Sequence, residues 1–206
     1  MNQKFFNLPT EKQNTIINAG YRVFSENKYK KSPISEIALE AGISKSLIFH
    51  YFKNKKELYL YLYQYGVEVL MKEAVKTQVF EEKDFFKLYL EGAKCKFEIF
   101  KKHKYLFNFM VRVYYEEDDE IRSEIEGKNE SLINYKNNLL MNNIDMYKFK
   151  DDIDIKNLDK MLNWCTEGYM KENYRDGNLD LDVLIDDFSG IIDFFRKNSY
   201  KEEYLR

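Results

Sequence analysis

Apolar residues recur at every third or fourth position along most of this chain, which is the spacing of one buried helix face. Polar and turn-forming stretches separate these segments, and only two prolines and eight glycines occur in 206 residues. The pattern therefore predicts an all-α fold of about nine helices with short joints. The predicted helices cover residues 10–26, 33–41, 45–51, 54–77, 84–103, 105–115, 121–143, 155–175 and 181–198.

Residues 32–55 predict two short helices around a tight turn. Gly42 stands where the chain reverses, and glycine adopts the positive φ needed there without penalty. Ile48 and Phe52 turn inward toward the first of the two helices. A short surface helix of this kind can enter the major groove of DNA. Its outward face is left to Lys45, Ser46, Leu47, Phe49 and His50.

Polar residues at the predicted helix starts indicate caps, because their side chains can accept from free backbone N–H groups. A turn between the last two helices is indicated by Asp176, Gly177 and Asn178. The predicted N-caps are Thr10, Ser32, Ser44 and Asn54, with Gln13 and Glu57 completing capping boxes with Thr10 and Asn54.

Residues 16–58 resemble the N-terminal DNA-binding region of the TetR family of bacterial transcriptional regulators. The strongest parts of the resemblance are IA at 37–38, AGISK at 41–45, FHYF at 49–52 and KKEL at 55–58. A matching helix precedes the helix-turn-helix and another follows it, so the signal is more specific than a lone motif. We expect a three-helix DNA-binding domain at residues 1–53 and a larger helical bundle at 54–206, which resembles the family only in length and helical character.

The resemblance also implies which residues contact DNA. Tyr51 and Lys55 match positions that contact phosphate, and Lys55 lies in a first helical turn, where free N–H groups can hold an anion. Lys45 can donate to guanine, and Leu47 and Phe49 can pack on thymine methyl groups. The positions implied to face bases are Ser35, Lys45, Ser46, Leu47 and Phe49.

Some of these assignments have alternatives. The family often has Gly or Pro where this chain has Ser46, and Tyr where it has Phe49. Core packing within the small domain is an equal alternative for Phe49 and Tyr51. His50 belongs to the outward face, where a solvated residue is the simpler interpretation than a pH switch.

The last two predicted helices each carry an apolar stripe. Antiparallel helices of this type bury their stripes in a four-helix interface when two chains pair about a two-fold axis. The family resemblance implies such a homodimer, which would read a palindromic operator in double-stranded DNA. The alternative is that both stripes face the core of their own chain. The candidate interface residues are Leu158, Met161, Leu162, Cys165, Tyr169, Leu181, Leu184, Phe188, Ile191 and Phe195.

Aromatic residues make up 17% of the chain and concentrate between Tyr59 and Tyr115. Ligand sites are mainly apolar with few polar groups, so this region is a candidate pocket for a small, largely apolar effector. Its binding would tilt the helix that begins at Asn54 and release the operator. Ordinary core packing is the alternative. The candidate lining residues are Tyr63, Phe86, Tyr89, Phe97, Phe100, His103, Phe107, Met110, Tyr114 and Trp164.

The net charge of −2 conceals an asymmetry. Residues 1–57 contain ten Lys and Arg against five Asp and Glu, whereas the remainder contains 23 against 30. A basic module on an acidic body is typical of a protein that reads DNA with one end. Chance clustering on a solvated surface is the alternative.

Other classes of function find little support in the sequence. Residues 116–120 (EEDDE) favour the start of the next helix through its dipole, and they lack the glycine and spacing of a calcium loop. The two histidines belong to different predicted domains, and no metal, cofactor or catalytic motif is recognisable. We predict a non-enzymatic cytoplasmic protein without a membrane segment, with Cys95 and Cys165 as reduced core residues. A helical adaptor that binds an anionic surface is the main alternative.

Overall fold

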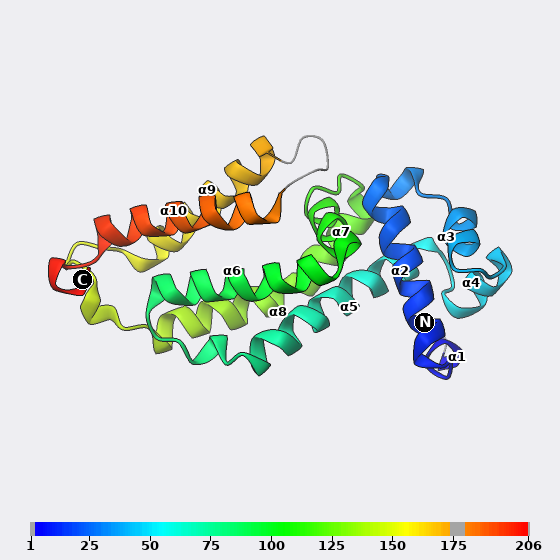
Figure 1. The fold of residues 1–206 in the computed structure, drawn as a ribbon, viewed down its shortest axis with the longest axis horizontal. Helices are drawn as coiled ribbons and strands as arrows, with labels where there is room; N and C mark the ends of the chain where they lie inside the picture. Colours follow the sequence, from blue (N-terminus) through cyan, green and yellow to red (C-terminus); the bar gives the residue numbers. More distant parts are fainter. Residues whose placement is uncertain (1–2, 174–179, 206) are drawn as a thin grey trace. The chain divides into compact units, whose positions relative to one another are not determined.

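The computed structural model describes residues 3–173 and 180–205, apart from the side chains of residues 104, 131–133, 135–137 and 139–142. The predicted turn at 176–178 lies outside the described residues. Within them the chain forms ten α-helices, drawn in Figure 1. These are α1 (Gln3–Phe6), α2 (Thr10–Glu26), α3 (Ile34–Glu40), α4 (Lys45–Tyr51), α5 (Lys55–Lys76), α6 (Phe85–Lys102), α7 (Lys104–Tyr114), α8 (Asp119–Asn143), α9 (Ile155–Asn173) and α10 (Leu181–Ser199).

The all-α prediction is confirmed, and the bounds of α2 to α10 lie within two residues of those predicted, except that the predicted end of α9 at residue 175 lies outside the described residues. The sequence missed α1, a single turn whose Phe5 is fully buried. Four residues are too few to show a helical period, so the apolar pattern gave no signal there. Among the described helices, none combines the length and apolar character that a bilayer crossing requires.

Two of the predicted caps are confirmed. Leu47 N donates to Ser44 Oγ over 3.2 Å at the start of α4. Glu57 N donates to Asn54 Oδ1 over 2.8 Å at the start of α5. Because these bonds satisfy free N–H groups of the first turn, they fix where each helix begins.

The predicted capping box at Thr10 and the predicted N-cap at Ser32 are wrong. Prolines 9 and 33 occupy the two capping positions. Gln13 Nε2 instead donates to Leu8 O over 2.8 Å, in the link between α1 and α2. Ser32 is buried and its hydroxyl donates to Lys28 O over 3.1 Å. Each side chain therefore stabilises the preceding segment.

The chain divides into two compact units. Unit 1 comprises residues 1–71 and 102–133, and unit 2 comprises residues 72–101 and 134–206. Unit 1 holds α1 to α4, the first part of α5, α7 and the first part of α8. The predicted boundary at residues 53 and 54 stays a prediction.

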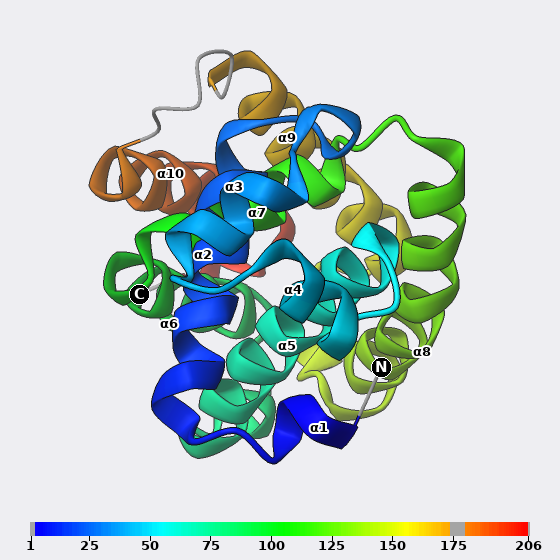
Figure 2. The same ribbon diagram turned by 90° about the vertical axis from the view of Figure 1, so that its right-hand side faces the viewer.

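Unit 1 is built around α2, which packs against α3 and α7; α2, α3 and α4 face the viewer in Figure 2. Gly66 in α5 marks a close approach, because a Cβ there would lie 2.9 Å from Leu106 Cδ1. Aromatic rings join the elements: Phe24, Tyr59 and Phe109 pack within 6.3 Å of one another, centroid to centroid.

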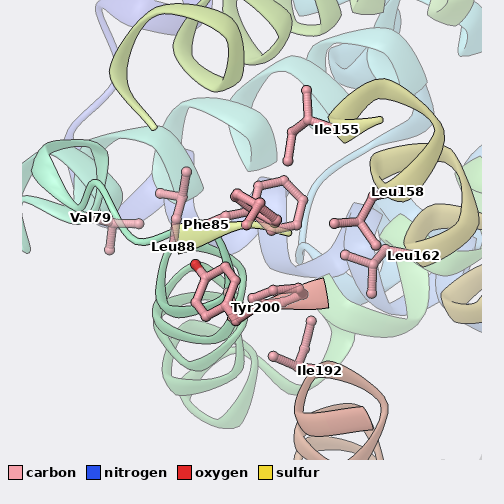
Figure 3. Packing of buried hydrophobic residues seen from close by; sticks show 10 residues of the cluster. Val79, Phe85, Leu88, Ile155, Leu158, Leu162, Ile192 and Tyr200 are labelled. Carbon is pink, nitrogen blue, oxygen red and sulfur yellow. The ribbon is translucent and has the colours of Figure 1, made fainter. Parts of the chain in front are cut away.

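Unit 2 has its own core, shown in Figure 3. Phe149 and Tyr200 form an isolated antiparallel bridge, and their rings lie 4.8 Å apart. This bridge ties the end of α10 to the segment before α9. The buried cluster consists of Val79, Phe85, Phe86, Leu88, Phe149, Ile155, Leu158, Leu162, Ile192 and Tyr200.

Candidate nucleic-acid interface

The turn between α3 and α4 has the geometry that the sequence predicts. Gly42 has a φ of 64°, the left-handed conformation in which other residues are strained. Ile43 N donates to Ala38 O over 2.9 Å and closes the turn. Ile37 and Ile48 are buried on the facing sides of the two helices. The turn and this contact fix α4 against α3, so the outward face of α4 has a defined position.

The outward face of α4 carries the residues predicted for base contact. Lys45, Ser46 and His50 are exposed, Leu47 is half-buried, and Phe49 is 40% exposed. Lys45 Nζ lies 5.9 Å from the centroid of the Phe49 ring. This helix therefore presents one cation beside an aromatic face, a combination suited to guanine and thymine edges.

Helix α3 adds a second exposed surface. The predicted contact residue Ser35 is exposed, and so is Leu39, with 81% of its surface accessible. The sequence analysis did not single out Leu39. Its exposure beside the turn makes it an additional candidate contact.

Tyr51, one of the two predicted phosphate contacts, is only 8% exposed. Its ring packs edge-on against Phe5 of α1, with 6.0 Å between centroids. Phe5 also contacts Phe52, with 4.9 Å between centroids. The ring of Tyr51 thus belongs to the core that fixes the end of α4, and its contact with phosphate stays a prediction.

Lys55, the other predicted phosphate contact, is held within the protein. Its ammonium donates to Tyr29 O, Lys30 O and Ser32 O over 2.8, 3.2 and 3.3 Å. It also lies 4.5 Å from the Tyr29 ring centroid, and burial lowers the pKa of Lys55. Three acceptors match the three protons of an ammonium. Lys55 therefore fastens the start of α5 to the segment before α3, and its phosphate contact stays a prediction.

Helix α7 fastens the end of α2 in a similar way. Arg112 donates to Ser25 O through Nε and to Glu26 O over 3.2 Å through Nη2. A guanidinium at the carboxyl end of a helix satisfies its free carbonyls and suits the helix dipole. The segment that leads into the helix-turn-helix is thus held from both sides, by Arg112 and by Lys55.

The candidate pocket residues are divided between the units. Tyr63, His103, Phe107, Met110 and Tyr114 belong to unit 1, and Phe86, Tyr89, Phe97, Phe100 and Trp164 belong to unit 2. Phe86 lies in the packed core of unit 2, whereas Tyr114 and Trp164 are largely exposed. Tyr63 donates to Asn129, and Tyr89 donates to Asp159. A pocket lined by these residues stays a prediction.

The candidate interface residues of α9 and α10 differ in burial. Three leucines of the predicted stripes, Leu158, Leu162 and Leu184, are buried in unit 2. Phe188, Ile191 and Phe195 are half-buried against its core, and so the own-core alternative describes much of both stripes. Leu181 is half-buried, and Tyr169 donates to Asp187.

Each of the two helices also exposes apolar side chains. On α9 these are Met161, Trp164 and Cys165, and Trp164 is 66% exposed. On α10 they include Val183 and Phe194, and Phe194 is 64% exposed. The core position expected for Cys165 is therefore wrong, whereas Cys95 is half-buried and packs on the unit 2 core. Met161 and Cys165 were among the predicted interface residues, whereas Trp164, Val183 and Phe194 were not.

Metal binding has no candidate in the described part of the chain. No group of three or more His, Cys, Asp or Glu side chains there is arranged to hold an ion. The acidic residues that follow α7 contact lysines instead, as described below.

Comparison with known proteins identifies a likeness in the N-terminal segment. Residues 16–62 match the family model described as bacterial regulatory proteins, tetR family. This segment is therefore similar to the DNA-binding region of TetR family regulators. The matched residues contain α3, α4 and most of α2, which are the elements that form the candidate interface. The family match is confined to this part of the chain.

Known relatives extend the likeness to the whole fold. The fatty acid metabolism regulator protein of Bacillus subtilis is 41% identical over 49 residues, which span only 25% of that protein. A TetR family transcriptional regulator from Chloroflexus aurantiacus has a similar structure, with a TM-score of 0.72 and 20% identity over 98% of this chain and 99% of that one. The regulator FadR from Bacillus subtilis, in complex with stearoyl-CoA, gives a TM-score of 0.65 and 21% identity over 87% and 96%. At these identities the two structures support the fold alone.

Proposed function

We propose that this chain is a transcriptional regulator that reads double-stranded DNA through α4. The observation that carries the proposal is the outward face of α4, where Lys45, Ser46 and Phe49 are exposed on a helix fixed by Gly42 and Ile48. The TetR family match covers this same segment. Lys45 would donate to a guanine, and Phe49 and Leu47 would contact thymine methyl groups. Action on chromosomal DNA implies a cytoplasmic protein.

The regulator would act as a homodimer. One seven-residue recognition helix reads few bases, whereas two copies about a two-fold axis read a palindrome with half-sites about one helical turn apart. The exposed apolar side chains of α9 and α10 support this pairing, because large exposed apolar side chains on a soluble surface mark contact sites.

A small, largely apolar effector would release the operator. The support is the aromatic content of the chain and the fold shared with FadR, whose structure contains stearoyl-CoA. A long-chain acyl-CoA is therefore the first compound to test. Binding should raise the melting temperature of the protein and weaken its complex with DNA, because an effector must prefer one of the two states. Repression is the mode that we expect.

Selection from a pool of random duplexes tests the proposed function. We expect the bound fraction to converge on a palindromic sequence, and we expect Lys45→Ala to relax the preference at one base pair of each half-site. A pool that stays random after repeated selection would contradict sequence-specific reading. It would favour the alternative of a helical adaptor that binds anionic surfaces. No feature of the described residues supports that alternative over DNA reading.

A further inference from the structure

An acidic corner follows α7 and makes ion pairs with lysines of the DNA-binding region. We use this name for the carboxylates of Glu116, Glu117, Asp118, Glu120 and Glu124, which lie between the end of α7 and the second turn of α8. All the residues involved belong to unit 1. The paired atoms are Lys28 Nζ with Glu117 Oε2 at 2.9 Å, Lys30 Nζ with Asp118 Oδ2 at 3.0 Å, and Lys56 Nζ with Glu120 Oε1 and Glu124 Oε1 at 2.9 Å each.

The backbone of the corner is itself held in place. Glu116 accepts from the N–H groups of Glu117 and Asp118 through Oε1, and from Tyr29 N through Oε2. Asp118 Oδ1 accepts from Ile121 N and caps the start of α8. Glu116 and Asp118 thus shape the corner, whereas Glu117 and Glu120 are bound only at their tips.

The paired lysines lie beside the elements that would meet DNA. Lys28 and Lys30 belong to the short segment between α2 and α3, and Lys56 lies in the first turn of α5, directly after α4. Lys55 joins these two places through its contacts with residues 29, 30 and 32. In a helix-turn-helix protein the first helix crosses the phosphate backbone, so the segment that leads into α3 lies next to phosphates.

The carboxylates already make the contacts that phosphate would make. A carboxylate and a phosphate both accept charge-assisted hydrogen bonds from an ammonium at about 2.7–2.9 Å. The hydrogen bond with Asp118 raises the pKa of Lys30, and those with Glu124 and Glu120 raise the pKa of Lys56. The lysines are thus charged and engaged before DNA arrives.

The exposure of Glu117 and Glu120 favours exchange, whereas the side chain of Asp118, which pairs with Lys30, is only 9% exposed. The side chains of Glu117 and Glu120 are 80% and 67% exposed. Ion pairs this exposed contribute little to folding and are screened by salt. Phosphate can therefore replace these glutamate carboxylates readily. The ion pairs affect the affinity for anions more than the stability of the fold.

We propose that the acidic corner competes with DNA phosphate for Lys28, Lys30 and Lys56, and thereby holds down sequence-independent DNA binding. This inference rests on the proposed function. A lysine that must first leave a carboxylate contributes less free energy to binding a phosphate. A larger share of the affinity for DNA then comes from the base contacts of α4. Specificity is then improved by weakening the wrong complexes.

A mutant cycle on Lys56 tests the competition. Glu120→Gln/Glu124→Gln frees this lysine without touching the cap at Asp118, and Lys56→Gln is then added in both backgrounds. Glu68→Gln/Glu130→Gln is the matched control, since it removes the same charge from unit 1 and neither carboxylate pairs with a lysine among the described residues. Affinity for a random 20-base-pair duplex (a probe length we choose) is measured across a salt series of about 50–200 mM.

We expect Glu120→Gln/Glu124→Gln to bind the random duplex about threefold more tightly, with a salt slope steeper by about one unit. Lys56→Gln should cancel this gain in the double variant and change little in the wild type. The control should change affinity much less. Equal affinity of the double variant and its control, or a gain that survives Lys56→Gln, would overturn the proposal.

Retention on heparin decides the matter if the wild type binds random DNA too weakly to measure. The double variant should then elute at higher salt than its control, and equal elution would overturn the proposal. Neither the random-duplex measurement nor the heparin measurement uses a preferred DNA sequence, so their results are independent of the proposed function. Loss of sequence preference in the wild type would remove the proposed function and leave the competition for polyanions intact.

Discussion

The surface around α3, α4 and the start of α5 differs from the surface of α9 and α10 in what it leaves exposed. The first presents lysines and small polar residues beside Leu39 and Phe49, and three of its lysines are already paired with carboxylates. The second presents Trp164 and Phe194, both more than 60% exposed. Exposed ion pairs exchange readily with phosphate and respond to salt, whereas large apolar side chains favour a lasting dry contact. The difference therefore suggests a reversible surface for DNA and a permanent one for a second copy.

The largest expected effect is on self-association. We expect Trp164→Glu/Phe194→Glu to weaken the dimer more than a hundredfold, since each aromatic side chain at an interface centre contributes about 2 kcal/mol or more. Sedimentation would then show monomers with unchanged helical content by circular dichroism. Val75→Glu is the control, because Val75 is equally exposed but lies on α5. A variant that remains fully dimeric would show that α9 and α10 do not form the interface.

Two neighbouring residues of α4, Ile48 and Phe49, should separate a role in folding from a role in DNA recognition. Ile48 is 1% exposed, so Ile48→Ala should lower the free energy of unfolding by about 2–4 kcal/mol. Phe49→Ala should leave it within about 0.5 kcal/mol and weaken operator binding instead. Urea unfolding and DNA titration of both variants check the pair. Equal loss of stability in the two would mean that Phe49 belongs to the core.

A variant of Lys55 tests whether this lysine stabilises the fold or contacts DNA phosphate. Lys55→Gln removes charge-assisted bonds to three carbonyls, so we expect the free energy of unfolding to fall by about 1–3 kcal/mol. Lys53→Gln is the control, since Lys53 is an exposed lysine two residues earlier. If unfolding is unchanged and only the salt slope of DNA binding flattens by about one unit, Lys55 contacts phosphate and its contacts with the carbonyls matter little.

Two glycines in helices should respond in opposite directions. Gly66→Ala should destabilise the protein by about 1–3 kcal/mol, because its Cβ would lie 2.9 Å from Leu106 Cδ1 and 3.2 Å from the Tyr21 hydroxyl. Gly127→Ala meets nothing within 4 Å and should stabilise α8 by about 0.5–1 kcal/mol. Thermal unfolding of both variants checks the contrast. Destabilisation by both would show that α8 packs differently around Gly127.

The smallest expected effect concerns acid. The hydrogen bond from Lys30 holds the pKa of Asp118 below its usual value of 3.8. A depressed folded pKa means that this stabilisation is present above about pH 4 and is lost as the pH falls through the folded value. The urea midpoint of the wild type should therefore fall more steeply below pH 4 than that of Asp118→Asn. Parallel curves would mean that the contact with Lys30 is absent in solution.

The two surfaces also differ in how well the sequence predicted them. In the helix-turn-helix, Gly42 and the cap at Ser44 fix the backbone locally, so the inward and outward residues of α4 followed directly from their positions. In α9 and α10 the helices were predicted, but of their exposed apolar residues only Met161 and Cys165 were predicted for the interface. Leu158 and Leu162 are as apolar as Met161 and Trp164, and only tertiary packing decides which face is buried.

The contacts of Lys55 and of the acidic corner could not be predicted from the sequence, for a related reason. Lys55 is 26 residues from Tyr29, and Glu120 is 64 residues from Lys56. No helical period or cap rule connects residues so far apart. The sequence did predict that the acidic residues 116–120 favour the start of the next helix, and the cap at Asp118 agrees with that part of the prediction.

Competition between two duplexes tests the central claim most directly. Fluorescence anisotropy would measure the affinity of the wild-type protein for DNA from upstream of its own gene and for a shuffled duplex of equal length and composition, at one fixed salt concentration. We predict a preference of about a thousandfold or more for the upstream DNA, the lower end for specific regulators. Equal affinity for the two duplexes would contradict the proposal that α4 reads a DNA sequence.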